Sequence, residues 1–203
     1  MNLEPIILQG HHVRLVPMTA EHVPALWEAG RDPDLWRLTT NQPASEADMR
    51  VYVDAALRAQ AAGTALPFVT TEAATGRVVG STRFGSVEPA HRRAEIGWTW
   101  IAAPWQRTAI NTEAKYWMLR HAFESLGCVR VELKTDVLNE RSRRAILRIG
   151  ATEEGILRRH MITDSGRMRD TVYFSILDDE WPDVKARLEQ RLAAAPSPAA
   201  TPA

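Results

Sequence analysis

The stretch WQRTAINTEAK at residues 105–115 decides how this sequence folds. It follows a run rich in β-branched and aromatic residues, and it precedes apolar side chains spaced as on one face of a helix. This pattern predicts a strand that enters a helix through a short loop. The free N–H groups of a helix's first turn favour a phosphate, but phosphate loops usually carry glycines and this one has none.

Helices and strands are predicted on both sides of this stretch. A half-buried strand at residues 11–18 is followed by two helices, which Thr19 and Ser45 cap. Three runs rich in Val, Thr, Phe and Trp, between residues 65 and 102, then predict an antiparallel meander. A helix up to Gly127, a strand, a helix opened by Asn139 and a closing hairpin complete the order β-α-α-β-β-β-α-β-α-β-β.

Composition and charge indicate one domain and exclude several classes of partner. With 203 residues the chain can bury one sizeable core, so we expect a single α/β (α+β) domain at residues 1–190. The 25 acidic and 25 basic residues balance, which argues against nucleic acid and membrane partners. The Ala/Pro-rich residues 191–203 are expected to form a disordered tail.

Cysteine content and apolar patterning predict a soluble protein of the reducing cytoplasm. The single cysteine, Cys128, cannot form an internal disulfide, and no apolar run approaches the ~20 residues of a membrane span. The first residues lack the pattern of a signal peptide. The histidines have no metal-ligand spacing, so we expect no metal site.

The loop at residues 104–111 has two interpretations, an anion site or an ordinary helix start. Gln106, Arg107 and Thr108 add side-chain donors to the free backbone N–H groups, and Arg107 adds a charge that can pair with a phosphate oxygen. Most such junctions bind nothing, so the local sequence by itself favours a capped helix start with a solvated arginine.

A second helix start, NERS at residues 139–142, leaves the same choice open. Asn139 and Ser142 lie one turn apart and can face the same side. Plain capping by Asn139, with Ser142 exposed, is the more common arrangement. Arginines that follow on this helix form either a solvated face or partners for a phosphate held by the neighbouring loop.

Glu95 is a carboxylate in the middle of a predicted strand. Alternation along the strand puts Glu95 on the face opposite Trp98 and Trp100. A buried carboxylate is costly without a partner. Glu95 is therefore expected either at an exposed strand end with Arg92 or Arg93, or in a wet functional cleft.

These features occur in an order that resembles a known family. A Glu-bearing strand, the Gln106 loop and an N-x-x-S helix with its RIGA ending resemble the GCN5-related N-acetyltransferases (GNAT), and most of all the group with the ribosomal-protein-alanine N-acetyltransferases. The resemblance extends from His12 to about Trp181. It implies a mixed, mostly antiparallel sheet of about seven strands that splays in the middle, flanked by about four helices.

The resemblance also implies acetyl-CoA as co-substrate. The family's loop pattern Q/R-x-x-G-x-G/A falls on residues 106–111, with Ala109 and Asn111 as departures. The departures matter only if those positions need a positive φ or a bare Cα, because the donors are backbone N–H groups. The residues implied to bind acetyl-CoA are Trp100, Ile101, Gln106, Arg107, Thr108, Ala109, Ile110, Asn111, Thr112, Asn139 and Ser142.

The implied activity is direct transfer of the acetyl group to a primary amine, either a protein N-terminus or a small amine. By family position Glu95 would be the base, acting through a water, and Ser142 the acid near the sulfur. A backbone N–H near Trp100 or Ile101 would bind the thioester carbonyl. Cys128 is expected to be a packing residue rather than a nucleophile.

The acceptor pocket would be lined by the first two helices, the loop at residues 36–42, the hairpin near residues 158–161 and Tyr173. Because dimers are common in the group that the sequence resembles, a homodimer is one expected assembly. The alternative function is a non-catalytic acyl-CoA-binding or sensor module on the same fold.

Overall fold

An eight-stranded sheet forms the centre of the protein in a computed structural model, which describes residues 1 and 3–195. β5 and β6 pair in parallel, and all other neighbouring strands pair antiparallel. In spatial order the strands are β1 (Leu8–Gln9), β2 (Val13–Pro17), β3 (Leu66–Glu72), β4 (Val78–Glu88), β5 (Arg93–Ile101), β6 (Arg130–Asp136), β8 (Met168–Leu177) and β7 (Thr152–Ile162).

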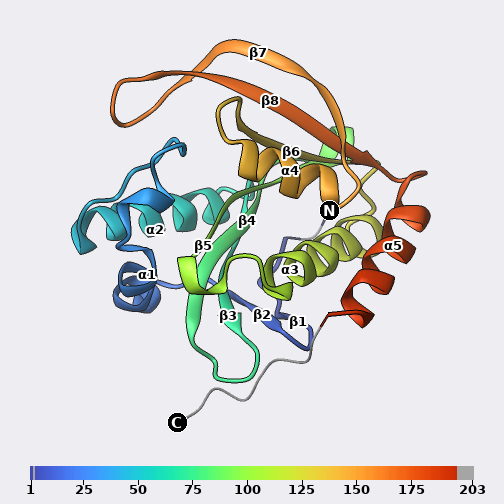
Figure 1. Cartoon of the computed structure of the whole chain (residues 1–203), viewed down its shortest axis with the longest axis horizontal. Helices are drawn as coiled ribbons and strands as arrows, with labels where there is room; N and C mark the ends of the chain where they lie inside the picture. The colour runs from blue at the N-terminus through green and yellow to red at the C-terminus, as the bar shows by residue number, and fades with distance from the viewer. Residues whose placement is uncertain (2, 196–203) are drawn as a thin grey trace.

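Helices cover both faces of the sheet (Figure 1). α1 and α2 lie on one face, and α3 and α5 lie on the other. The side chains of Phe68 and Val69 illustrate the two layers, because these neighbours in β3 belong to different apolar cores. The α-helices are α1 (Val23–Gly30), α2 (Glu46–Ala61), α3 (Ala109–Arg120), α4 (Glu140–Arg148) and α5 (Trp181–Ala193).

A buried carboxylate on α3 fixes the start of the sheet. Glu113 is 3% exposed, and its two oxygens accept hydrogen bonds from the backbone N–H groups of His11, His12 and Val13 at 2.7–2.9 Å. A Cβ at Gly10 would lie 2.2 Å from the Glu113 carboxyl carbon. The β1–β2 turn is therefore built around this carboxylate, and a side chain at residue 10 would collide with it.

The parallel pair β5–β6 is short and opens towards one end. Arg93, Ala94 and Glu95 pair with residues 130–132, and no register pair joins the two strands beyond Glu95. The rest of β6 pairs with β8 instead. Two strand edges thus diverge in the middle of the sheet, as the family resemblance implied.

The predicted orientation of Trp98 and Trp100 is wrong, because β5 contains a β-bulge. Ser81 pairs with Trp100 whereas Arg83 pairs with Gly97, so three steps along β5 oppose two along β4, and Trp98 has a φ of 49°. Trp98 and Trp100 therefore pack in the α1–α2 core, although simple alternation placed them on the face opposite Glu95. One inserted residue reverses the alternation, and Gly97 directly before Trp98 is the type of residue that often marks such a bulge in a strand.

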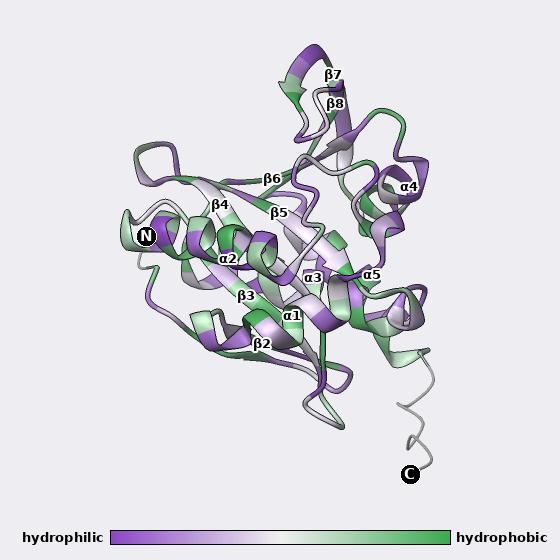
Figure 2. Ribbon diagram, turned by 90° about the vertical axis from the view of Figure 1, so that its left-hand side faces the viewer, coloured by the Kyte–Doolittle hydropathy of each residue, from purple (hydrophilic) through white to green (hydrophobic). Residues whose placement is uncertain are grey.

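The C-terminal part contains a helix that the sequence did not predict. The β7–β8 hairpin projects from the rest of the molecule (Figure 2), and α5 follows it. Because α5 continues to Ala193, the first residues of the expected tail at 191–203 are helical; residues 196–203 lie outside the described part. Among the described residues, no helix is both long and apolar enough to span a membrane.

Candidate active site

A cavity of about 710 Å³ lies where β5 and β6 diverge. Residues 95–101 of β5 and residues 133–135 of β6 form its two long walls. The loop at residues 35–41 and the hairpin residues Met161 and Arg169 line one end, while α3, α4 and the loop before α3 line the other. The divergence of the strands is what creates this space.

The loop before α3 has its left-handed residue at an unexpected position. Arg107 has a φ of 64°, whereas Ala109 is the first residue of α3 and has a negative φ. Thr108 is the N-cap, and its hydroxyl accepts from the N–H of Ile110 at 3.3 Å. Glycine at residue 109 would therefore bring no conformational benefit, because the chain is already helical there.

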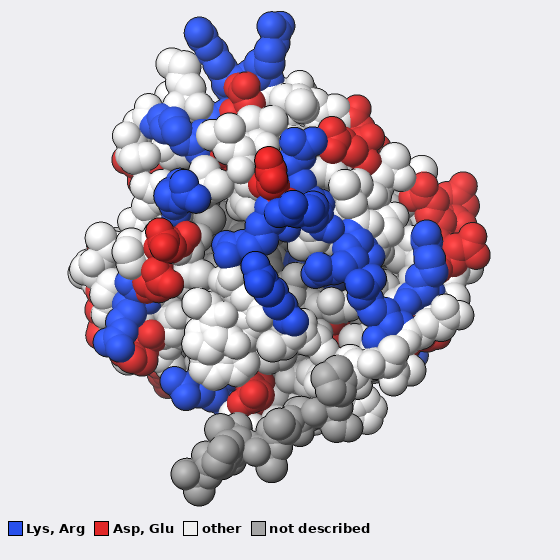
Figure 3. Space-filling view, viewed as in Figure 1, with Lys and Arg blue, Asp and Glu red and all other residues white. Residues whose placement is uncertain are grey.

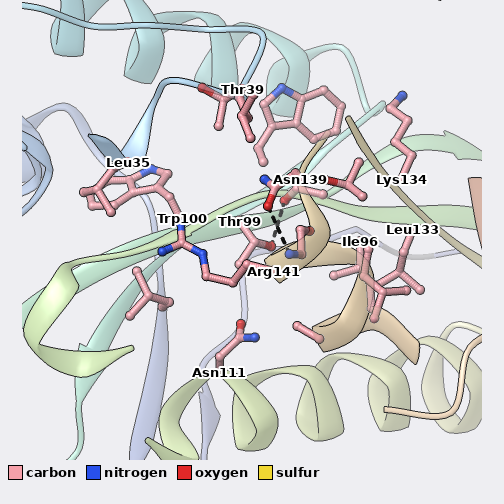
Figure 4. A pocket seen from close by; sticks show the side chains of 18 of the residues that line it. Leu35, Thr39, Ile96, Thr99, Trp100, Asn111, Leu133, Lys134, Asn139 and Arg141 are labelled. Atoms are coloured by element: carbon pink, nitrogen blue, oxygen red, sulfur yellow. Dashed lines mark hydrogen bonds between the residues drawn. The ribbon is translucent and has the colours of Figure 1, made fainter. Parts of the chain in front are cut away.

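Asn111 has an unsatisfied buried oxygen beside the cavity. Its Oδ1 has no hydrogen-bond partner among the described residues, and the side chain lines the cavity (Figure 4). A buried acceptor without a donor is costly, so this position suits a group that supplies one. Asn111 does not cap its own helix, since Thr108 does so.

Basic side chains surround the same end of the cavity. Lys and Arg gather at the centre of the face shown in Figure 3, and Arg107, Arg141, Arg144 and Arg148 all line the cavity. Gln106 bridges the mouth, because its Nε2 donates to the Ile101 carbonyl at 2.8 Å and its Oε1 accepts from Arg141 Nη1 at 2.6 Å. At this end of the cavity several guanidinium groups are available to bind an anion.

Asn139 and Ser142 face the cavity from the start of α4. Asn139 Oδ1 accepts from the Ser142 N–H at 3.0 Å, which is the capping arrangement (Figure 4). Capping uses only the amide oxygen, so the Asn139 NH2 group stays available. The Ser142 hydroxyl donates to no described residue and lines the cavity. Capping and ligand binding are thus compatible here.

Glu95 lies in the cavity wall and is 3% exposed. Its Oε2 pairs with Lys134 Nζ at 2.8 Å and accepts from the Ser86 hydroxyl at 3.3 Å. Its Oε1 has no donor among the described residues. A Cβ at residue 97 would lie only 2.5 Å from this oxygen, so the glycine there makes room for it. Of the two positions that the sequence left open, Glu95 occupies the cavity wall and not an exposed strand end, and its partner is Lys134 instead of Arg92 or Arg93.

Lys115 is a second titratable group in the wall, and sequence reasoning missed it. The side chain is 5% exposed, and Nζ donates to the hydroxyl groups of Thr99 at 2.6 Å and Thr82 at 3.3 Å. Burial lowers the pKa of Lys115 to about 7. The only sequence signal was a lysine on the apolar side of a helix.

Cys128 is buried, and burial raises the pKa of its thiol to about 11, which suits a packing role.

Comparison with known proteins now assigns the family. The family described as acetyltransferase (GNAT) domain matches residues 12–152. The chain belongs to the GNAT acetyltransferase family. It is 33% identical to a GCN5-related N-acetyltransferase of Brucella melitensis, whose crystal structure has a TM-score of 0.86 and covers 94% of this chain and 87% of its own.

Two further GNAT relatives are informative. Over 106 residues the chain is 37% identical to the Bacillus subtilis (strain 168) protein named "Putative ribosomal N-acetyltransferase YdaF", which covers 52% of this chain. The chain spans only 57% of that relative's length. A structure of Mycobacterium smegmatis RimJ in complex with CoA-disulfide has 25% identity, a TM-score of 0.76 and 92% coverage of both chains. These matches confirm the predicted family and fold class.

The cavity of this GNAT domain brings together most of the residues predicted from the sequence. It is lined by Glu95, Trp100, Ile101, Gln106, Arg107, Asn111, Asn139 and Ser142. Four predicted residues do not line it: Thr108, Ala109, Ile110 and Thr112. The side chains of Ile110 and Thr112 are buried on the inner side of α3.

The end of the cavity opposite the α4 arginines corresponds in part to the expected acceptor pocket, and we call it the acceptor end. Tyr52, Met161 and residues 35, 36 and 38–41 line the cavity, whereas α1, Tyr173 and residues 158–160 do not. The rings of Trp36 and Trp100 pack at a centroid distance of 5.1 Å in its wall.

Proposed function

We propose that the protein is an acetyl-CoA-dependent N-acetyltransferase that acetylates a primary amine by direct attack. The observation that carries this proposal is the position of the cavity, which extends from the arginines of α4 to Glu95 between the diverging strands. It therefore offers an anion site and a buried carboxylate within one space, in a chain of the GNAT family.

The residues of the cavity fit acetyl-CoA. Arg107, Arg141, Arg144 and Arg148 suit its phosphates, and the unpartnered Oδ1 of Asn111 can accept a hydrogen bond from it. The RimJ relative was solved with CoA-disulfide, which supports the same ligand class here. When bound, acetyl-CoA supplies the acetyl group as an activated thioester.

The side chains of the wall supply proton transfer and polar contacts. Oε1 of Glu95 accepts a proton from the acceptor amine, directly or through a water, while Lys134 holds Oε2. The free hydroxyl of Ser142 donates towards the departing thiolate. Because the Ile101 carbonyl points to the open edge of β5, where it meets Gln106, its N–H points there too and can bind a carbonyl oxygen.

Two measurements test the proposal. Acetyl-CoA should raise the melting temperature by mass action, and a panel of amines should release free thiol. No stabilisation at millimolar acetyl-CoA would exclude it. Tight binding without thiol release would instead favour the non-catalytic acyl-CoA-binding module. The cytoplasmic location and the homodimer stay predictions.

A further inference from the structure

Arg169 is a buried guanidinium at the acceptor end of the cavity, and no carboxylate of the described residues forms an ion pair with it. It is 6% exposed, lies on β8 and lines the cavity. Its Nη1 donates to the Thr40 hydroxyl at 3.1 Å, while neither Nε nor Nη2 donates to any described residue. A buried cation without a counter-charge is costly unless another group offsets it.

The two buried acids nearby are already paired with other cations. Glu95 pairs with Lys134 at 2.8 Å. Asp136 is fully buried, with one oxygen bound to Arg167 and the other accepting from the Leu138 N–H at 3.0 Å. The charges of Glu95 and Asp136 are therefore offset by Lys134 and Arg167, and neither carboxylate forms an ion pair with Arg169.

The remaining polar neighbours do not offset the charge of Arg169 either. Burial, together with the charges of Lys134 and Arg169, lowers the pKa of His160, so His160 is neutral near pH 7. Arg83 is also buried, but it is stacked between the rings of Tyr52 and Trp98 and does not line the cavity. Asp164 on the same rim is exposed and binds the Gln42 N–H, so Arg169 is a buried positive charge of the acceptor end that no described carboxylate contacts.

The position of Arg169 is fixed by contacts between the hairpin and the loop at residues 36–42. The Asp164 N–H donates to the Thr40 carbonyl at 3.0 Å, and the Gln42 N–H donates to Asp164 Oδ2 at 2.9 Å. Together with the Thr40–Arg169 hydrogen bond, these contacts join the two segments that form the rim. The guanidinium is therefore held in place before any ligand arrives.

We propose that Arg169 binds a carboxylate of the acceptor, so that the substrate is an amine that carries a carboxylate within a few bonds of its nitrogen. This inference rests on the proposed function and names the substrate class for the same site. A guanidinium suits a carboxylate through two parallel N–H···O bonds, and Nη2 and Nε form one such edge. The reactive form of this substrate, with a neutral amine and a carboxylate, has one negative charge and can offset the positive charge of Arg169.

The experiment compares amines that differ only in this charge. Acetyl transfer to the twenty amino acids and to their C-terminal amides is measured for the native protein, Arg169→Gln, Arg169→Lys and the control Arg158→Gln. Arg158 is exposed on the same hairpin and lies outside the cavity. We expect the native protein to prefer the carboxylate by roughly tenfold to a hundredfold in kcat/KM, with Arg169→Gln losing the preference and Arg158→Gln keeping it.

Two further arms separate the possible results. Dipeptide amides that begin with Glu or Gln show whether the carboxylate can come from the side chain of a peptide's first residue. Calorimetry with N-acetylated amino acids and their amides, on protein saturated with CoA, measures the same preference without turnover. The melting temperature shift with CoA shows that each variant is folded and binds CoA.

Each outcome decides one of the two proposals. Turnover without a carboxylate preference overturns the role of Arg169 and leaves the acetyltransferase function. A preference in binding that Arg169→Gln abolishes, with no turnover of any amine, supports the subsite and overturns the function. An equal loss for acids and amides in Arg169→Gln makes Arg169 structural only.

Discussion

Lys134 Nζ lies 2.8 Å from Oε2 of Glu95 in the cavity wall, and the other carboxylate oxygen, Oε1, has no donor among the described residues. Oε1 lies against residue 97, which has room for it because it is a glycine. The pair thus combines a fixed carboxylate with one free acceptor atom, which is the geometry that a positioned base needs.

The first prediction is that Glu95→Gln lowers acetyl transfer by roughly 10²–10⁴-fold, the usual contribution of general acid–base catalysis. The binding of acetyl-CoA should change little, because the basic end of the cavity is untouched. A matched control is Glu132→Gln, since Glu132 pairs with Glu95 in register but bonds Arg93 and Arg130 and does not line the cavity. Equal loss of kcat in both variants would contradict the role of Glu95.

The second prediction concerns the glycine-free loop. Ala109→Gly should leave the affinity for CoA within about twofold, because Ala109 is helical and needs no positive φ. At Arg107 the backbone is left-handed, so Arg107→Asn keeps a tolerated conformation but removes the charge. We expect Arg107→Asn to weaken CoA binding in isothermal titration. A tenfold gain in affinity for Ala109→Gly would show that the loop changes conformation when CoA binds.

Much of this fold follows from local patterns, and the exceptions have physical causes. The cap at Ser45 was predictable because its hydroxyl accepts from the Asp48 N–H, as the residue spacing indicates. The two-residue strand β1 was not, since it depends on Glu113, about one hundred residues away. The bulge at Trp98 depends on its register with β4. Such long-range contacts leave little trace in local sequence.

The candidate site divides in the same way. Gln106, Asn139 and Ser142 follow from motif positions, because each sits at or near a helix start where its polar group is useful. Lys115 and Arg169 became visible only when the fold placed them in the cavity wall. Each looks in the sequence like one charged residue among many.

The third prediction is that Glu113→Gln destabilises the protein by roughly 2–4 kcal/mol. The amide would keep one acceptor oxygen but direct its own NH2 group at backbone donors that the carboxylate now binds. Urea unfolding measures the change in the free energy of unfolding. Glu140→Gln is the control, because Glu140 is exposed and its ion pair with Arg144 is long at 3.8 Å, so the change should stay within about 0.5 kcal/mol.

The last prediction follows from the burial of Lys115, which forms no ion pair with a carboxylate in the described part of the chain. Its pKa is lowered to about 7 in the folded protein from an ordinary value of 10.5. Between these two pH values the unfolded chain binds more protons than the folded one, so the Lys115 contribution to stability rises with pH across this window. This contribution of Lys115 to stability is fully present above pH 10.5 and is lost as the pH falls to about 7.

Lys115→Met removes this titration while it keeps a long side chain in the wall. At pH 7 the variant should therefore be more stable by an amount of the order of a few kcal/mol, or roughly 5–10 °C in melting temperature, less the value of the two threonine hydrogen bonds. The difference between the two proteins should shrink steadily as the pH rises towards 10. If the melting temperatures of the two proteins instead differed by a constant amount over this pH range, Lys115 would keep its proton in the folded state and another group would compensate its charge.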